Sequence, residues 1–109
     1  MPKLVRDCIA TLLLLAAFIA HSHAQSPTMG ERLFTEQANP PCGLCHTLNA
    51  AQSTGTIGPN LDQLKPDRDK IKNAVKNAVG NMPPYGDSLS DDEIEAVSEY
   101  VAKAIAAKN

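Results

Sequence analysis

The pentapeptide Cys42-Gly43-Leu44-Cys45-His46 decides how the rest of this sequence is interpreted. Two cysteines three positions apart, followed at once by a histidine, are typical of the attachment site of a c-type haem. Each thiol can add to one vinyl group of the porphyrin, and the adjacent imidazole can become the proximal ligand of the iron. The motif therefore predicts one covalent haem c, held through Cys42 and Cys45, with His46 as an axial ligand.

A Cys-x-x-Cys pair has other known uses. A structural zinc site needs four ligands, but residues 25–109 offer only Cys42, Cys45 and His46 as cysteine or histidine, so zinc would also require a carboxylate. A thioredoxin-like dithiol is expected beside a strand, whereas Asn39-Pro40-Pro41 precedes this motif. A disulfide between the two cysteines would close a very short loop and stabilise little. Haem attachment is the preferred interpretation, and zinc and dithiol chemistry stay open as alternatives.

Residues 1–24 have the features of a cleaved signal peptide. Lys3 and Arg6 give a basic start, residues 9–20 form an apolar run of about a dozen residues, and residues 22–24 supply the small side chains of a cleavage site. The apolar run is shorter than the roughly 18 residues that suggest a membrane-spanning helix. We therefore expect a cleaved leader over 1–24 and one periplasmic domain over 25–109, with no stable membrane insertion after cleavage.

The charge balance excludes one class of partner. The chain has a formal net charge of −2, and its leader carries Lys3 and Arg6 against Asp7, so the remaining 85 residues carry −3. An acidic domain of this size is not expected to bind nucleic acid. A domain of 85 residues with few aromatic side chains is also small for a stable core, so the haem is expected to supply apolar surface for packing.

Two capping boxes mark the first and last helices of the domain. Thr28 with Glu31 predicts a helix from Met29 to about Gln37. Ser90 with Glu93 predicts that the last helix begins directly after Ser90. Both helices carry apolar residues at helical spacing, so each is expected to bury one face.

A middle helix is predicted between Asp67, which can cap its start, and Gly80, which can end it. One face of this helix is basic, with Arg68, Lys72 and Lys76 four residues apart. Such a stripe is usually a solvated face, and the alternative is that it steers an acidic partner toward the protein.

The remaining segments show no strand pattern. Residues 47–57 have no clear hydrophobic period and are expected to form a loop along one edge of the haem. Gly30 lies inside the first helix, where a glycine costs about 1 kcal/mol relative to alanine, so we expect another helix to approach closely there. The expected fold is all α, with three main helices and loops around one covalent haem.

Met82 is the preferred sixth ligand of the iron. His46 is the only histidine of residues 25–109, which excludes ligation by two histidines of one chain. Met29 is the only other methionine of that region and lies at a helix start, whereas Met82 lies in the loop Asn81–Gly86, which is rich in glycine and proline. A proximal imidazole normally donates its second N–H to a carbonyl, and Pro59 is the candidate for that carbonyl.

These features resemble the class I c-type cytochromes, especially the small bacterial monohaem proteins. The resemblance covers residues 28–106 and is carried by five motifs in order: Gly30-x-x-x-Phe34, Cys42-x-x-Cys45-His46, Gly58-Pro59-x-Leu61, Met82-Pro83-x-Tyr85 and Tyr100-Val101. It implies the cytochrome c fold, in which the first and last helices cross near their glycine and aromatic positions.

The resemblance also implies the roles of individual residues. Cys42 and Cys45 correspond to the thioether positions, His46 and Met82 to the axial ligands of the iron, and Pro59 to the carbonyl that orients His46. Many relatives use a tryptophan to bind a haem propionate. The present sequence contains none, so Tyr85 or a backbone group is the expected replacement.

The function expected from these observations is periplasmic transport of single electrons, without a catalytic residue in the chain. The partners would be periplasmic redox proteins: a dehydrogenase as donor and an oxidase or reductase as acceptor. One alternative is the haem c subunit of a periplasmic dehydrogenase complex, for example one that oxidises sulfite. A further alternative is a haem enzyme or gas sensor with an open iron site, which requires that Met82 be displaced.

Overall fold

The computed structural model describes residues 25–108. Its helical segments, in chain order, are α2 (Met29–Arg32), the wide helical turn η2 (Leu33–Gln37), α3 (Cys42–Cys45), the short turn η3 (Asn49–Ala51), α4 (Leu61–Leu64), α5 (Arg68–Asn77) and α6 (Asp91–Ala106). In the described part of the chain the strands are β1 (Thr47–Leu48) and β2 (Ser53–Thr54). The predicted, mainly helical fold class is confirmed. The leader predicted over 1–24 lies outside the described residues.

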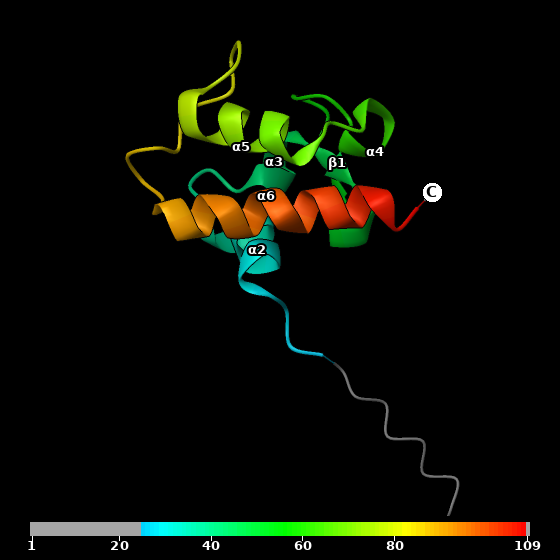
Figure 1. Cartoon of the computed structure of the whole chain (residues 1–109). Helices are drawn as coiled ribbons and strands as arrows, with labels where there is room; N and C mark the ends of the chain where they lie inside the picture. Colours follow the sequence, from blue (N-terminus) through cyan, green and yellow to red (C-terminus); the bar gives the residue numbers. More distant parts are fainter. Residues whose placement is uncertain (1–24, 109) are drawn as a thin grey trace, which may run out of the picture.

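Helix α6 is the central element of the fold. It runs across the molecule with α5 on one side and α2 on the other (Figure 1). The contact with α2 depends on Gly30, because a Cβ atom there would lie 2.3 Å from the carbonyl oxygen of Ala96 and 2.6 Å from the Cβ of Tyr100. The aromatic ring of Tyr100 then meets Phe34, with ring centroids 6.1 Å apart. The close helix approach predicted from Gly30 is therefore present.

Both predicted capping residues lie at their helix starts. The Thr28 hydroxyl accepts a hydrogen bond from the Glu31 N–H at 3.2 Å, and α2 continues into η2 as far as Gln37. At α6 the capping box is complete, since the Ser90 hydroxyl accepts from the Glu93 N–H and the Glu93 carboxylate accepts from the Ser90 N–H. These ends are determined by residues three positions apart, which is why the sequence predicts them well.

Helix α5 begins as predicted but ends earlier. Asp67 caps its start through a 2.9 Å hydrogen bond from the Lys70 N–H. The prediction that this helix runs to Gly80 is wrong, because α5 ends at Asn77.

The returning chain explains the early end of α5. The carbonyls of Val75 and Lys76 accept hydrogen bonds from the N–H groups of Tyr85 and Gly86, at 2.8 and 3.2 Å. In a longer helix the N–H groups of residues 79 and 80 would occupy those carbonyls. Gly86 is suited to this approach because a Cβ atom there would lie 2.8 Å from the Lys76 carbonyl oxygen.

The segment predicted as a loop over 47–57 contains a small hairpin. Strands β1 and β2 pair antiparallel, with Thr47 opposite Thr54 and Leu48 opposite Ser53. Two residues per strand are too few to produce a detectable period in the sequence. Leu48 is fully buried, so the hairpin belongs to the packed part of the molecule.

The core is formed mainly by η2, α5 and α6. Its apolar members are Leu33, Phe34, Ala38, Leu48, Ile71, Val75, Tyr85, Ile94, Val97, Val101 and Ile105. Among residues 25–108, no helix is long and apolar enough to cross a membrane.

Candidate functional site

The Cys-x-x-Cys-His motif forms one turn of helix followed by an extended residue. Cys42 and Cys45 are the first and last residues of α3, so their side chains share a face of the helix. His46 ends the turn with extended backbone, and its N–H donates to the Cys42 carbonyl at 3.0 Å. Both thiols and the imidazole line the same cavity. This is the arrangement that the haem motif requires.

The back of the motif is closed by tight backbone packing. A Cβ atom on Gly55 would lie 2.6 Å from the carbonyl oxygen of Leu44 and 2.8 Å from the backbone nitrogen of His46. The Gly58 N–H donates to the Cys45 carbonyl at 2.7 Å. The segment that follows the hairpin therefore supports the motif from behind.

His46 is held in a defined orientation. Its Nδ1 lies 2.8 Å from the carbonyl oxygen of Pro59. A carbonyl can only accept, so Nδ1 carries the proton and Nε2 keeps the lone pair that a metal ligand needs. Gly58 packs against the ring, since a Cβ atom there would lie 2.6 Å from Cε1 of the imidazole. The expected contact between His46 and Pro59 is present, and Gly58, named before only as part of the motif Gly58-Pro59-x-Leu61, also contacts the ring.

Met82 reaches the same cavity from a distant part of the sequence. It lies on the loop between α5 and α6, where its N–H donates to the Val79 carbonyl at 3.0 Å and closes a tight turn. Its side chain is half-buried and lines the same cavity as Cys42, Cys45 and His46. The tertiary structure thus brings together four candidate haem residues that span 40 positions of sequence.

The cavity itself is apolar and has a volume of about 540 Å³. Besides the four candidate residues, it is lined by Phe34, Pro41, Ile57, Gly58, Pro59, Leu61, Leu64, Pro66, Lys70, Ile71, Asn73, Ala74, Val75, Val79, Asn81, Pro83, Tyr85, Val97 and Val101. A volume of this size is within the range of cofactor sites, which are mostly apolar with a few polar groups. The residues present fit a porphyrin: two thiols for covalent attachment, one imidazole, one thioether and an apolar wall.

Burial affects the ionisation of Cys42. It raises the pKa of this thiol to about 11, although hydrogen bonding from the backbone acts in the opposite direction. The unmodified sulfur is therefore protonated at neutral pH. Conversion to a thioether removes this titration altogether, so the buried position suits the attached form.

Tyr85 has a different partner from the one expected. Its hydroxyl donates to the carbonyl of Pro40 at 2.7 Å, and the side chain is 4% exposed. Burial, followed by the nearby sulfurs of Cys42 and Cys45, raises the pKa of Tyr85 to about 12. The hydroxyl thus ties the Met82 loop to the segment before the haem motif, and the expected role as a propionate donor is not supported by this contact.

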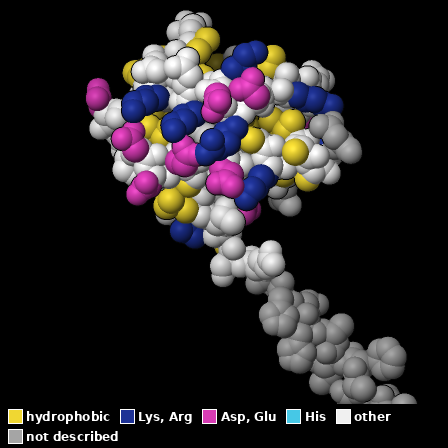
Figure 2. Space-filling view, in the orientation of Figure 1, with side chains coloured by type: hydrophobic (Ala, Val, Ile, Leu, Met, Phe, Trp, Pro, Cys, Tyr) yellow, Lys and Arg dark blue, Asp and Glu magenta, His cyan; other side chains and the backbone are white. Residues whose placement is uncertain are grey.

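The basic stripe of α5 is neutralised by carboxylates of α6. Arg68 and Lys72 both pair with Glu95, and Lys72 Nζ lies 2.8 Å from a Glu95 oxygen. Lys76 pairs with Asp91 at 3.0 Å. Figure 2 shows basic and acidic side chains interleaved over this face. Because each cation has a carboxylate beside it, the stripe is a poor candidate for steering an acidic partner.

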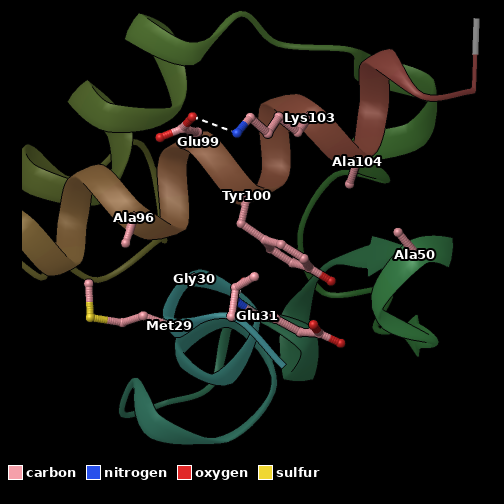
Figure 3. A pocket seen from close by; sticks show the side chains of 10 residues that line it. Met29, Gly30, Glu31, Ala50, Ala96, Glu99, Tyr100, Lys103 and Ala104 are labelled. Carbon is pink, nitrogen blue, oxygen red and sulfur yellow. Dashed lines mark hydrogen bonds and ion pairs between the residues drawn. The ribbon is translucent and has the colours of Figure 1, made fainter. Parts of the chain in front are cut away.

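A second pocket lies at the crossing of α2 and α6 (Figure 3). It is lined by Met29, Gly30 and Glu31 from α2 and by Ala96, Tyr100 and Ala104 from α6, among others. The Tyr100 hydroxyl is buried there and has no hydrogen-bond partner among the described residues. None of the five candidate haem residues lines this pocket, so it is separate from the site described above.

Comparison with known proteins agrees with this geometry. The family model described as cytochrome C oxidase, cbb3-type, subunit III matches residues 25–101. Cytochrome c6 of Gloeothece citriformis is 32% identical over 108 residues, covering 93% of both chains. Chloroplastic cytochrome c6 of Chlamydomonas reinhardtii is 31% identical over 87% of this chain and 66% of its own length. The chain belongs to the class I c-type cytochromes.

A solved structure supports the same assignment for this cytochrome. The crystal structure of the c-type cytochrome SorU from Sinorhizobium meliloti superimposes with a TM-score of 0.68 at 47% sequence identity, covering 71% of this chain and 87% of that one. The cytochrome is therefore an electron-transfer protein that carries covalent haem c, and Cys42 and Cys45 have the spacing that this attachment needs.

Sequence reasoning missed part of the haem cavity of this cytochrome. It did not identify Ile57, Leu64 and Val79 as lining residues. These side chains line the cavity and are 79%, 59% and 61% exposed, so they lie where the cavity opens to solvent. The helix predicted to run to Gly80 would have included Val79, but α5 ends before it. Exposed apolar residues in loops have no periodic signal, so only the folded chain reveals that they lie together.

Proposed function

We propose that this cytochrome is a periplasmic one-electron carrier in which His46 and Met82 are the two axial ligands of the haem iron. The observation that carries the proposal is the shared cavity, where a single imidazole and a single thioether accompany both thiols. Haem c with such ligands cycles between ferrous and ferric iron, and a methionine ligand raises its reduction potential. With both axial positions taken by side chains, substrate chemistry at the metal is disfavoured.

The chain's own residues would supply the orientation and the environment. The Pro59 carbonyl accepts a hydrogen bond from Nδ1–H of His46 and so directs Nε2 into the cavity. The apolar wall formed by Phe34, Val97 and Val101 excludes water from the site. Exclusion of water limits the rearrangement of solvent that accompanies a change of charge, which suits rapid electron transfer.

The spectrum of the holoprotein tests the ligation. The full chain would be expressed in cells competent for c-haem maturation, and the oxidised protein would be compared with Met82→Ala and with Met29→Ala as the matched control. We expect a weak far-red sulfur-to-iron band in the wild type that is lost only in Met82→Ala. Retention of the band in that variant would contradict the ligation. Rapid carbon monoxide binding to the reduced wild type would favour an open-site enzyme or gas sensor.

The location is a separate part of the proposal. The basic start, apolar run and small residues of 1–24 support export with cleavage after Ala24. The mass of the haem protein recovered from a periplasmic fraction should correspond to a chain that begins at Gln25. A protein that retains residues 1–24 on the membrane would contradict this part of the proposal.

The mouth of the cavity is the proposed docking face. Ile57, Leu64 and Val79 form an exposed apolar collar, and Lys70 is the only charged residue that lines the cavity. Redox encounters commonly bury less than about 1,200 Å², so a few apolar side chains make up a large share of such an interface. We expect the partner to present an apolar surface of its own.

Collar variants test this docking face. Ile57→Ser and Val79→Ser should each slow electron transfer to a redox partner several-fold, with little dependence on salt, because no charge is removed. Met29→Ser is the control, since Met29 is also exposed but lines the other pocket. Reversing the charges of Arg68 and Lys76 should have a smaller effect, because both already pair with α6. A strong salt dependence that disappears in those reversals would contradict the apolar docking face.

The same collar favours a second candidate, the haem subunit of a periplasmic dehydrogenase complex. Exposed apolar side chains suit a permanent interface as well as a transient one. Size-exclusion chromatography of periplasmic extracts distinguishes the two: a free carrier elutes as a small protein, and a subunit elutes with its catalytic partner.

A further inference from the structure

The loop that carries Met82 leaves α5 through a strained residue. Ala78 has φ 72° and ψ 158°. A positive φ with an extended ψ is a conformation that essentially only glycine adopts without penalty, because a Cβ atom crowds the backbone. Gly80, two residues later, has φ 57°. The glycine is therefore two residues away from Ala78, the position whose backbone conformation most requires a glycine.

The two ends of this loop are fixed. On the α5 side the Ala78 N–H still donates to the Ala74 carbonyl at 3.0 Å, and on the return side the N–H groups of Tyr85 and Gly86 donate to Val75 and Lys76. Tyr85 is also buried and donates through its hydroxyl to Pro40. The loop must therefore close over a fixed distance, which explains how Ala78 is kept in an unfavourable conformation.

Between these ends the loop has little packing. Val79, Asn81, Pro83 and Pro84 are exposed, and Met82 is only half-buried. A Cβ atom on Gly80 would have no neighbour within 4 Å. Apart from the partial packing of Met82 against the core and the hydrogen bond from its N–H to the Val79 carbonyl, few contacts oppose a movement of the loop. The backbone energy of Ala78 therefore forms a large part of the free-energy difference between a closed and a released loop.

We propose that Ala78 is a positioning residue whose strained backbone weakens the hold of Met82 on the haem iron. The inference rests on the proposed role of Met82 as the sixth ligand. In the closed loop Ala78 has the positive φ seen here, and release of Met82 lets the residue return to an ordinary conformation. A small nitrogen ligand such as imidazole should therefore displace Met82 more readily than it would from an unstrained loop.

The test compares two substitutions of opposite expected effect. Ala78→Gly removes the penalty from the closed loop, and Gly80→Ala adds one at φ 57° without a steric clash. Ala107→Gly is the matched control, because Ala107 has φ −64° and lies at the exposed end of α6, where no strain is relieved. Each oxidised holoprotein would be titrated with imidazole while the far-red band is followed.

Ala78→Gly should raise the half-saturating imidazole concentration by about three-fold or more. This factor already includes the opposing effect of glycine, whose greater backbone freedom favours the released loop. Gly80→Ala should lower it by a similar factor, and Ala107→Gly should leave it unchanged. A value for Ala78→Gly at or below that of the wild type would overturn the inference alone. Absence of the band from the wild type would instead overturn the ligation by Met82, and this inference with it.

Discussion

The two walls of the haem cavity are built in different ways. The wall that carries His46 is tightly packed, because Gly55 lies against the backbone of residues 44–46 and Gly58 lies against the imidazole, and neither position leaves room for a side chain. The wall that carries Met82 is an exposed loop, fixed at its ends and strained at Ala78. His46 is thus held by close packing, whereas the position of Met82 depends on a loop that is fixed mainly at its two ends.

This difference leads to different expectations for the two residues proposed as ligands of the iron. An imidazole next to two covalent attachment points cannot leave without disturbing α3, because Gly58 and Pro59 hold the ring on two sides. Met82 is only half-buried against the core and lies on an exposed loop, so its side chain can be released with less disturbance of the fold. We therefore expect substitutions on the His46 side to affect the whole protein, and substitutions on the Met82 side to act mainly on ligation.

The largest expected effect is on the His46 side. Gly58→Ala places a methyl group 2.6 Å from the imidazole, so the ring or the turn must shift. We expect the free energy of unfolding of the holoprotein to fall by about 2–3 kcal/mol, as for overpacked cores, measured by urea denaturation. Gly80→Ala on the Met82 side is the matched control, and a loss of only about 1–2 kcal/mol is expected there from its backbone conformation. Equal losses would mean that the two walls do not differ as described.

Tyr85→Phe should have an intermediate effect. It removes the 2.7 Å hydrogen bond to Pro40 and leaves that carbonyl without its donor, while the ring stays in the core. The expected loss is about 1 kcal/mol of unfolding free energy, with easier displacement of Met82 by imidazole because one anchor of the loop is weakened. Loss of stability without any change in the imidazole titration would show that Tyr85 supports the core and not the loop.

The smallest effect concerns the ion pair that joins the end of α5 to the start of α6. Lys76 lowers the pKa of Asp91 below its ordinary value of 3.8. A lowered pKa in the folded state means that the pair stabilises the protein above pH 3.8, and that this contribution is lost as the pH falls through the lowered pKa.

Comparing wild type with Asp91→Asn isolates this contribution. Asp91 is fully exposed, so the difference in unfolding free energy should be slight at neutral pH and absent in strong acid. Asp92→Asn is the control, because Asp92 shares the first turn of α6 but no ion pair of the described residues includes it. A difference that grows toward low pH would contradict the assignment of the pKa shift to Lys76.

Local patterns allowed most of the helix starts to be predicted. Thr28, Asp67 and Ser90 each cap a helix through a backbone N–H three residues later. The haem motif is equally local, since Cys42, Cys45 and His46 lie within one helical turn. The close approach at Gly30 was also predicted, because a glycine within a helix suggests a packing reason.

The errors have a common physical origin. The end of α5 was placed three residues too late because the carbonyls of Val75 and Lys76 bond to residues 85 and 86, far along the chain. The hydroxyl of Tyr85 found its acceptor 45 positions earlier in sequence, at Pro40. The sequence left open whether the basic stripe of α5 is a solvated face or steers a partner, and only the tertiary structure shows Glu95 and Asp91 beside it.

By itself, the sequence determined the attachment chemistry, the three main helices and the residue types that can ligate the iron, because these depend on spacings of three or four residues. Only the tertiary structure decided that Gly58 would pack against His46, that Ile57, Leu64 and Val79 would line one cavity, and that Ala78 would carry strain. Those outcomes depend on closing loops between anchors that are distant in the chain, and no local pattern records the cost or geometry of that closure.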